Sequence, residues 1–226
     1  MDSSIDRERS SMDIAIIGAG RIGGNIARQL AAGGHRLVLS YSRDLAALEA
    51  RAAEMGATAA APDDAVAGAE VVVIAVPWSV LPDALGAIGS LDGRIVIDTT
   101  NQFGAGPMPA EGQTAAAFNA GRMPGARYAK AFNTLTSAFQ VETAHREPRV
   151  VQWLCGDDQA AKDVVAGLIR DAGYAPVDLG GTAGCAVMEA PRRNGAVYGE
   201  EYRLAEALAV VDAVRDGRPI PPTPAY

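Results

Sequence analysis

The chain has 226 residues, of which 49% are hydrophobic and 21% are charged, and its formal net charge is −7. This composition supports a well-buried core and excludes a disordered chain. The length suits one domain of about 150 residues with a smaller addition, and two large domains would not fit. Nucleic acids and anionic membranes attract basic surfaces, so the acidic balance argues against both partners and favours a small-molecule ligand.

Residues 2–11 are charged and serine-rich, without the apolar segment of a signal peptide. The longest strongly apolar run, 71–76, is far shorter than the roughly 20 residues that cross a bilayer. We therefore expect a cytoplasmic protein with no membrane partner. Cys155 and Cys185 lack a CxxC spacing and a nearby histidine cluster. We expect both to pack in the core without a metal or redox-disulfide role, and we expect no metal site.

The first half of the chain alternates strand and helix patterns. An apolar strand at 13–17 leads into the segment Gly-Ala-Gly-Arg-Ile-Gly and a helix to about residue 32, which Gly33 and Gly34 end. A strand at 36–41, a helix at 44–55 and a brief strand at 57–60 follow. The β-branched runs 71–76 and 94–98 are typical of parallel strands buried on both faces. This alternation predicts an α/β fold with a Rossmann-type doubly wound parallel sheet and ligand over the carboxyl ends of its strands.

Further strands are expected at 126–131, 149–155 and 175–178, and further helices at 157–172 and 197–214. The last helix places Leu204, Leu208 and Val211 at helical spacing. These side chains could belong to the core, which we favour, or to the seam of a possible homodimer.

The segment 18–23 matches the GxGxxG fingerprint of dinucleotide-binding sites, and it has the right context because it follows a strand and opens a helix. Gly18 is then expected at the tight turn, Gly20 where a pyrophosphate approaches the backbone, and Gly23 where the helix meets the strand. We therefore predict a disordered tail at 1–11, a nucleotide-binding Rossmann domain at 12–140, a small α/β carboxyl-terminal region at 141–218 packed on it, and a tail at 219–226.

The end of the second strand indicates which nucleotide is bound. NAD-preferring sites usually carry an acid there, which accepts hydrogen bonds from the ribose. This chain has Ser42 and Arg43, a hydroxyl and a guanidinium that suit the 2′-phosphate of NADP(H). Asp44 lies near the position of the acid, but a helix cap explains it better. Ser42 could likewise be a cap and Arg43 a surface charge.

With these features the sequence resembles the coenzyme F420-dependent NADP oxidoreductase family, whose relatives include the reductase domain of metalloreductases and, more remotely, pyrroline-carboxylate reductases. The resemblance covers roughly residues 13–179. It depends on the segments 18–23, 42–43, 76–78 (Val-Pro-Trp), 98–101 (Asp-Thr-Thr-Asn), 130–134 (Lys-Ala-Phe-Asn-Thr) and 155–158 (Cys-Gly-Asp-Asp).

The resemblance implies that Ser42 and Arg43 hold the 2′-phosphate and that the segment 76–78 borders the nicotinamide half of the nucleotide. It also implies that the segment 131–133 lies near the site of hydride transfer. From the residues alone, Trp78 could equally be a packing residue and Asn133 a cap of a local turn. The predicted cofactor site comprises Gly18, Ala19, Gly20, Arg21, Ile22, Gly23, Ser42, Arg43, Val76, Pro77, Trp78, Asn101, Ala131, Phe132 and Asn133.

The sequence also departs from the family pattern. Some relatives carry a further basic residue one helical turn past the arginine, where this chain has Ala47. The segment 180–193 diverges as well, so the second substrate stays open. Arg192 and Arg193 in it could form a charged loop or an anion-binding patch.

The resemblance implies direct hydride transfer between NADP(H) and F420 or another flavin, which needs two stacked rings and no obligatory acid–base residue. No catalytic residue is assigned, since neither His35 nor His145 lies in a catalytic context. One alternative is an NADPH-dependent reductase of a small carbonyl or imine, with Tyr198, Tyr202 or Lys130 as proton donor. Another is an NADP-sensing module without chemistry.

Overall fold

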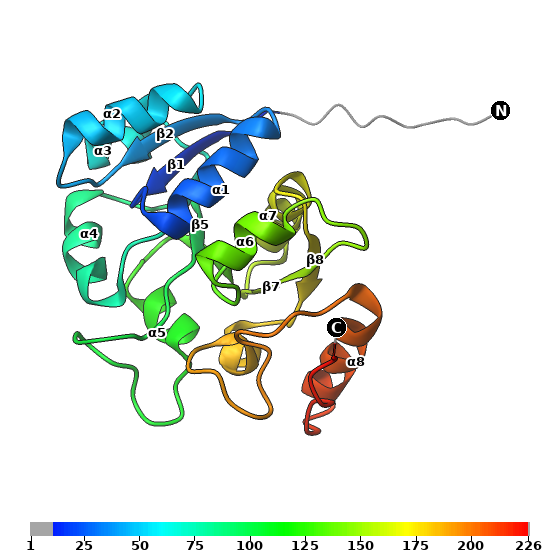
Figure 1. The fold of residues 1–226 in the computed structure, drawn as a ribbon. Coiled ribbons are helices and arrows are strands. Elements are labelled where there is room, and N and C mark those ends of the chain that lie inside the picture. The colour runs from blue at the N-terminus through cyan, green and yellow to red at the C-terminus, as the bar shows by residue number, and fades with distance from the viewer. Residues whose placement is uncertain (1–10, 226) are drawn as a thin grey trace.

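The computed structural model describes residues 11–225. Its sheet has eight strands in the order β3-β2-β1-β4-β5-β6-β7-β8 (Figure 1). The strands are β1 (Asp13–Ile17), β2 (Arg36–Ser40), β3 (Thr58–Ala59), β4 (Val71–Ile74), β5 (Ile95–Asp98), β6 (Arg127–Ala131), β7 (Val151–Cys155) and β8 (Ala175–Asp178). Neighbouring strands are parallel except β6 and β7, which are antiparallel. The predicted Rossmann-type fold is confirmed, with one antiparallel pair that the sequence did not indicate.

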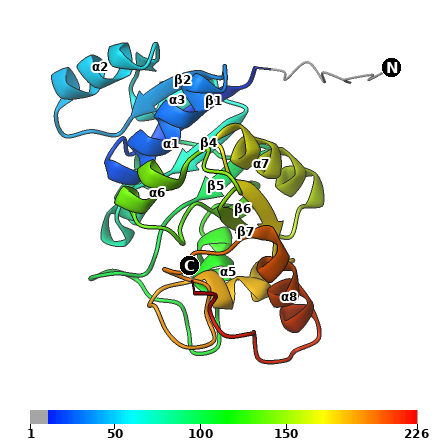
Figure 2. The same cartoon turned by 45° about the vertical axis from the view of Figure 1, so that its right-hand side comes forward.

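Helices cover both faces of this sheet (Figures 1 and 2). They are α1 (Arg21–Ala32), α2 (Leu45–Glu54), α3 (Pro62–Ala67), α4 (Leu81–Ala87), α5 (Ala115–Gly121), α6 (Ser137–Thr143), α7 (Gln159–Asp171) and α8 (Leu204–Arg215), with 3-10 helices η1 (Trp78–Val80) and η2 (Thr182–Met188). Successive strand residues point to opposite faces, so Ile16 packs in the layer with Leu30 of α1, whereas Ile17 packs in the layer with Leu81 of α4.

The last helix is shorter than predicted, because residues 197–203 form no helix. The face of α8 that packs on the protein consists of Ala207, Val210 and Ala213, whereas Leu204 and Leu208 are exposed. The expectation that these leucines pack in the core is therefore wrong, whereas the half-buried Val211 packs against the core, as expected. Small side chains lie on the inner face instead, where α8 packs against β8. A homodimer through the exposed leucines stays a prediction.

The expected domain boundary after residue 140 falls inside α6, and β7 extends the same sheet by pairing with β6. The two-part division stays a prediction. The expected tail at 1–11 lies outside the described residues except for Ser11, whose hydroxyl accepts a hydrogen bond from Arg36. The tail from 219 contains no helix or strand as far as residue 225, and residue 226 lies outside the described part.

Cys155 at the end of β7 and Cys185 in η2 form a disulfide, with their Cα atoms 5.9 Å apart. Both are fully buried, as expected, but the expectation that they stay unpaired is wrong. Their separation of 30 residues carries no spacing signal, and only the packing of η2 beside β7 brings them together. Within residues 11–225, no group of three potential metal ligands occurs, and no helix is long and apolar enough to cross a membrane.

Candidate cofactor-binding site

A cavity of about 730 Å³ lies at the carboxyl ends of β1, β2 and β4. The chain order reverses here, because β2 and β3 lie on one side of β1 while β4 and β5 lie on the other. Such a switch point is where doubly wound sheets bind ligands, and cofactor sites commonly measure roughly 300–1,000 Å³. The cavity is lined by Gly18, Ala19, Gly20, Tyr41, Ser42, Arg43, Ala47, Leu48, Arg51, Ala75, Val76, Pro77, Val80 and Asp83.

The glycine-rich loop forms one wall of this cavity. Gly18 has a φ of +96°, and a Cβ there would lie 2.7 Å from the carbonyl oxygen of Ala75. A Cβ at Gly23 would overlap the carbonyl oxygen of Gly18, whereas one at Gly20 would meet no protein atom within 4 Å. Packing of the protein therefore explains Gly18 and Gly23, and Gly20 is left open toward the cavity.

Helix α1 begins at this loop with a free amino-terminal end. Its N-cap is Gly20, no side chain caps it, and no acidic residue lies in its first turn. The first N–H groups and the positive end of the helix dipole therefore favour an anion. Arg21 on this turn is exposed and Ile22 half-buried, and neither lines the cavity. A pyrophosphate fits this end of the site.

The loop after β2 supplies the opposite wall. The carboxylate of Asp44 accepts a hydrogen bond of 2.9 Å from the N–H of Ala47 and caps α2, as the sequence indicated. The Ser42 hydroxyl donates to the carbonyl oxygen of Asp44 at 2.9 Å. Arg43 lines the cavity and forms no ion pair with any residue between 11 and 225. The cation at this wall is thus available to a ligand phosphate.

Arg51 is a cavity residue that the sequence analysis missed. It lies on α2 and donates a hydrogen bond to the carbonyl oxygen of Ala19 in the glycine-rich loop. The sequence feature that could have identified it is its spacing of four residues from Ala47, which places both residues on one face of the helix. Tyr41 and Asp83 also line the cavity, and burial together with the Asp83 charge raises the pKa of Tyr41.

The segment after β4 is divided between the cavity and the core. Val76 and Pro77 line the cavity, as expected, but Trp78 does not and is only 1% exposed. Its Nε1 donates to the carbonyl oxygen of Pro107 at 2.9 Å, and its ring stacks on Phe118 with centroids 6.0 Å apart. These contacts favour the packing interpretation of Trp78.

Asn101 and Asn133 meet at the carboxyl ends of β5 and β6. The Nδ2 of Asn133 donates to Asn101 Oδ1 at 3.0 Å and to the carbonyl oxygen of Met188 at 2.8 Å, and Asn101 Nδ2 donates to the carbonyl oxygen of Asn133 at 2.9 Å. Ala131 and Phe132 are fully buried beside them. None of the four lines the cavity after β1, β2 and β4.

A buried charge network underlies this pair. Asp98 accepts hydrogen bonds from Tyr128 at 2.6 Å, Asn119 at 2.7 Å and the Thr100 N–H at 2.8 Å, and Lys130 lies 3.5 Å away. Burial opposes ionisation of Asp98, but Lys130 and these hydrogen bonds outweigh it and hold the pKa below its usual value. Lys130 also donates to the carbonyl oxygen of Thr100 at 2.6 Å. The network fixes the backbone that leads to Asn101.

The paired arginines of the divergent segment are held by the protein itself. Arg192 forms an ion pair with Glu200, and Arg193 donates to the carbonyl oxygens of Glu189 at 2.7 Å and Pro191 at 3.0 Å. These contacts favour a structural role in the loop over an anion-binding patch.

Three comparisons place this geometry among known proteins. Residues 13–102 match the family model "NADP oxidoreductase coenzyme F420-dependent". A hypothetical protein from Sinorhizobium meliloti is 30% identical, with a TM-score of 0.75 over 87% of this chain and 97% of the other. A candidate F420-dependent NADP-reductase from Arthrobacter sp. FB24 is 29% identical, with a TM-score of 0.65 over 76% of this chain and 86% of the other.

Among curated proteins, the metalloreductase STEAP3 of Rattus norvegicus is 28% identical over 128 residues. The match covers 57% of this chain but only 26% of the rat protein. The chain thus corresponds to about a quarter of that relative. The matched family model, the shared fold and these relatives together support the coenzyme F420-dependent NADP oxidoreductase family for this chain.

Proposed function

We propose that the protein binds NADP(H) in the cavity after β1, β2 and β4 and transfers a hydride directly between it and F420 or another flavin-like acceptor. One observation carries the proposal. A single cavity joins an uncapped helix amino terminus above Gly20 to a wall with Ser42 and Arg43, and no acidic side chain binds the Arg43 guanidinium among residues 11–225. The helix amino terminus suits a pyrophosphate, and the wall with Ser42 and Arg43 suits a 2′-phosphate.

The nicotinamide ring would give or take the hydride when bound. The residues of the chain then have to hold it and exclude water. Val76 and Pro77 form an apolar wall at the end of β4, where the family resemblance places the nicotinamide half. Asn101 and Asn133 are held rigidly by their mutual hydrogen bonds at the ends of the next two strands. Rigid positioning of this kind supports transfer without an acid–base group.

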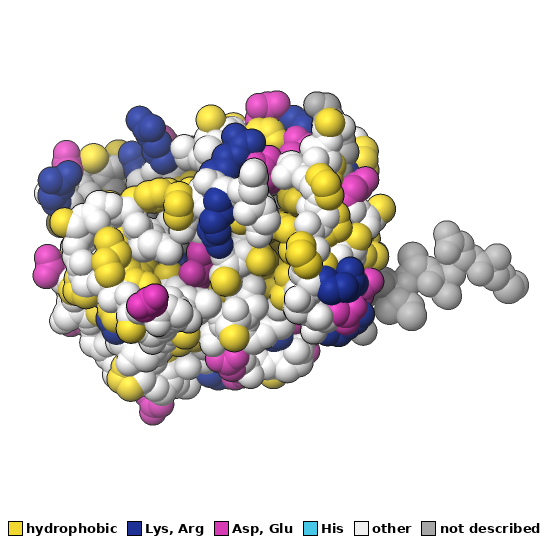
Figure 3. All heavy atoms as spheres, turned by 90° about the horizontal axis from the view of Figure 1, so that it is seen from below, with side chains coloured by type: hydrophobic (Ala, Val, Ile, Leu, Met, Phe, Trp, Pro, Cys, Tyr) yellow, Lys and Arg dark blue, Asp and Glu magenta, His cyan; other side chains and the backbone are white. Residues whose placement is uncertain are grey.

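We assign the acceptor to the loops that carry Phe103 and Tyr198, whose ring centroids lie 6.2 Å apart. The Phe103 N–H donates to the carbonyl oxygen of Asn101, and the Gly199 N–H donates to that of Thr134, so both loops are fastened beside the asparagine pair. Phe103 is 55% exposed. Figure 3, the view from below, shows hydrophobic side chains in several separate groups among charged ones. The exposed ring of Phe103 beside the half-buried ring of Tyr198 suits a planar heterocycle.

The burial of two candidate proton donors argues against the carbonyl or imine reductase. Lys130 is fully buried in the Asp98 network, and Tyr202 is 1% exposed against Trp153. Neither lines the cavity, and only Tyr198 of the three is partly exposed. Tyr198 lies on one of the loops to which we assign the acceptor, so the carbonyl or imine reductase would need Tyr198 as its proton donor.

The test is to mix the protein with NADPH and oxidised F420 and to follow the long-wavelength absorbance of F420. We expect bleaching that depends on the protein and on NADPH, with FMN as the comparison acceptor. NADPH consumption with a panel of ketones and imines, but with neither F420 nor FMN, would support the alternative reductase instead. Tight NADPH binding without turnover of any acceptor would support the sensing module.

A further inference from the structure

We propose that Arg51 is a second phosphate-binding residue, which acts with Arg43 on the 2′-phosphate of NADP(H). This inference rests on the proposed function, since it assigns a specificity residue to the same cavity. Arg51 is outside the glycine fingerprint and outside the segment after β2, and the sequence departs from the family pattern by placing Ala47 where some relatives have a basic residue. Arg51 supplies a cation one helical turn later.

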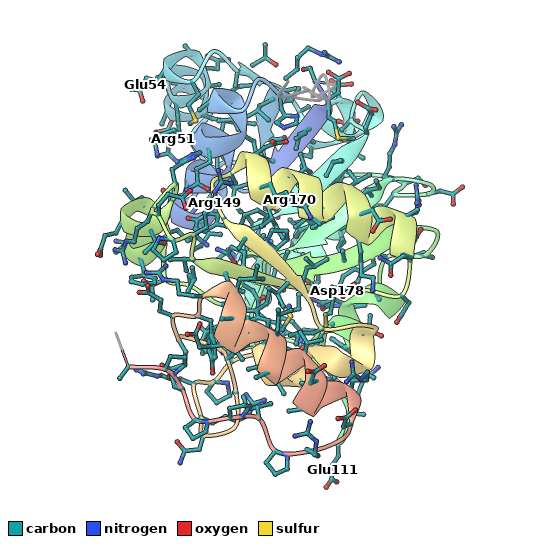
Figure 4. The ribbon with its side chains drawn as sticks, turned by 90° about the vertical axis from the view of Figure 1, so that its right-hand side faces the viewer. Arg51, Glu54, Glu111, Arg149, Arg170 and Asp178 are labelled. Atoms are coloured by element: carbon teal, nitrogen blue, oxygen red, sulfur yellow. A yellow bond between two sulfur atoms is a disulfide. The ribbon has the colours of Figure 1, made fainter. Side chains whose placement is uncertain are left out.

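The helix geometry directs Arg51 to the phosphate-binding wall. Ala47 and Arg51 are four residues apart on α2, and both line the cavity with Ser42 and Arg43. Long helical side chains point back toward the helix amino terminus, so the Arg51 side chain passes over the position of Ala47. A methyl group at position 47 leaves room for it. Figure 4 labels Arg51 on α2, and its hydrogen bond shows that it reaches the loop before α1.

The charge of Arg51 has no acidic partner in the described part of the chain. No carboxylate of residues 11–225 lies within ion-pair distance of Arg51 or of Arg43, although Asp83 lines the same cavity. A guanidinium has five N–H donors, and the bond to the carbonyl oxygen of Ala19 uses one of its nitrogens. Arg43 and Arg51 both line the cavity, and two guanidinium groups provide the donors and positive charge that a dianionic phosphate needs.

The hydrogen bond to Ala19 also gives Arg51 a structural role, which has to be distinguished from phosphate binding. Ala19 lies between Gly18 and Gly20, so the bond fastens α2 to the pyrophosphate-binding loop. A purely structural role would operate through this bond and would affect nucleotides with and without the 2′-phosphate equally. A direct phosphate contact affects only those that carry it.

The experiment separates these roles with adenosine 2′,5′-bisphosphate and AMP as calorimetric probes, in the parent and in R43A, R51A and R28A. Arg28 is an exposed arginine on α1 outside the cavity, which makes R28A the matched control. We expect R51A to weaken the bisphosphate by about tenfold or more and AMP by less than about threefold. We expect R28A to bind both as the parent does. In the double variant R51A with Ala47→Lys, bisphosphate affinity should recover because the cation returns one turn earlier.

Equal weakening of both probes in R51A, or parent-like binding of the bisphosphate, would overturn the inference. If R43A alone loses the bisphosphate, the proposed function survives and only the role of Arg51 fails. A parent protein that binds AMP and the bisphosphate equally would overturn both proposals. Thermal unfolding of each variant checks that affinity losses do not reflect loss of the fold.

Discussion

Gly23 of α1 packs directly against the carbonyl oxygen of Gly18, and a Cβ at position 23 would overlap that oxygen. This contact sets how closely the first turn of α1 approaches β1. Gly20, two residues after Gly18, has no such neighbour, and its φ of −71° lies outside the left-handed region that favours glycine. Packing within the protein therefore explains the glycine at position 23 but not the one at position 20. Substitutions at the two positions can separate the effect on stability from the effect on ligand binding.

We expect Gly20→Val to fold normally and to lose nucleotide binding, because its side chain would occupy the space that a pyrophosphate needs at the helix amino terminus. Gly23→Ala should instead destabilise the protein, since backbone must move to admit the methyl group. Circular dichroism and NADPH calorimetry measure the two properties. A Gly20→Val protein that binds NADPH as the parent does would contradict the fingerprint interpretation.

Removal of the Asn133 side chain should cost stability. In Asn133→Ala the buried carbonyl oxygen of Met188 and the half-buried Oδ1 of Asn101 lose their donor, and a buried unsatisfied polar group costs about 1–3 kcal/mol. We expect urea unfolding to show a loss in this range. Exposed Asn194, changed to Ala, is the control and should unfold as the parent does. A parent-like midpoint for Asn133→Ala would show that water satisfies these groups.

The histidines should be dispensable for turnover. His35 accepts a hydrogen bond from the Met12 N–H and lies 3.3 Å from Asp171, at the edge where β1 begins and far from the strand ends that form the cavity. His145 has a φ of 62°, which asparagine tolerates. We expect the double variant His35→Asn with His145→Asn to keep turnover within about threefold. A loss of about a hundredfold in a folded protein would indicate acid–base chemistry.

Asp158 makes stability depend on acid pH. It caps α7, and its hydrogen bond from Arg127, followed by that from the Ala161 N–H, lowers its pKa to about 2. Because this pKa is below the ordinary value of 3.8, the stabilisation is fully present above that pH and is lost as the pH falls toward 2. Asp158→Asn should therefore lose less stability than the parent between about pH 5 and pH 2. Identical pH profiles would contradict this role.

The sequence predicted the part of the molecule that depends on local patterns. The strand at 13–17, the glycine loop and the Asp44 cap all follow from periodicity and from hydrogen bonding within a few residues, and the structure shows each of them. The same local reasoning placed the cavity at the strand ends. The same reasoning assigned the 2′-phosphate only to residues directly after β2, so Arg51 was missed.

The remaining errors concern contacts between distant segments. Trp78 directly follows a strand, as a residue that lines the cofactor site would, yet the loop with Pro107 covers it. Leu204 and Leu208 have core spacing, but the packing of α8 turns Ala207, Val210 and Ala213 inward instead. Cys155 and Cys185 carry no spacing signal for their pairing. In each case the residue makes its contact with a segment that lies tens of residues away. A single sequence does not indicate which distant segments come into contact.

The most direct test of the account is the affinity of the parent and of Arg43→Ala for NADPH and NADH, measured by calorimetry at low and high salt. We expect the parent to prefer NADPH, and Arg43→Ala to weaken NADPH by roughly ten- to a hundredfold, because a hydrogen bond to a charged group is worth about 1.5–3 kcal/mol. NADH should change by less than about threefold, and salt should reduce the difference because the exposed ion pair is screened. Equal weakening of both nucleotides, or a parent that prefers NADH, would contradict the assignment of this wall to the 2′-phosphate.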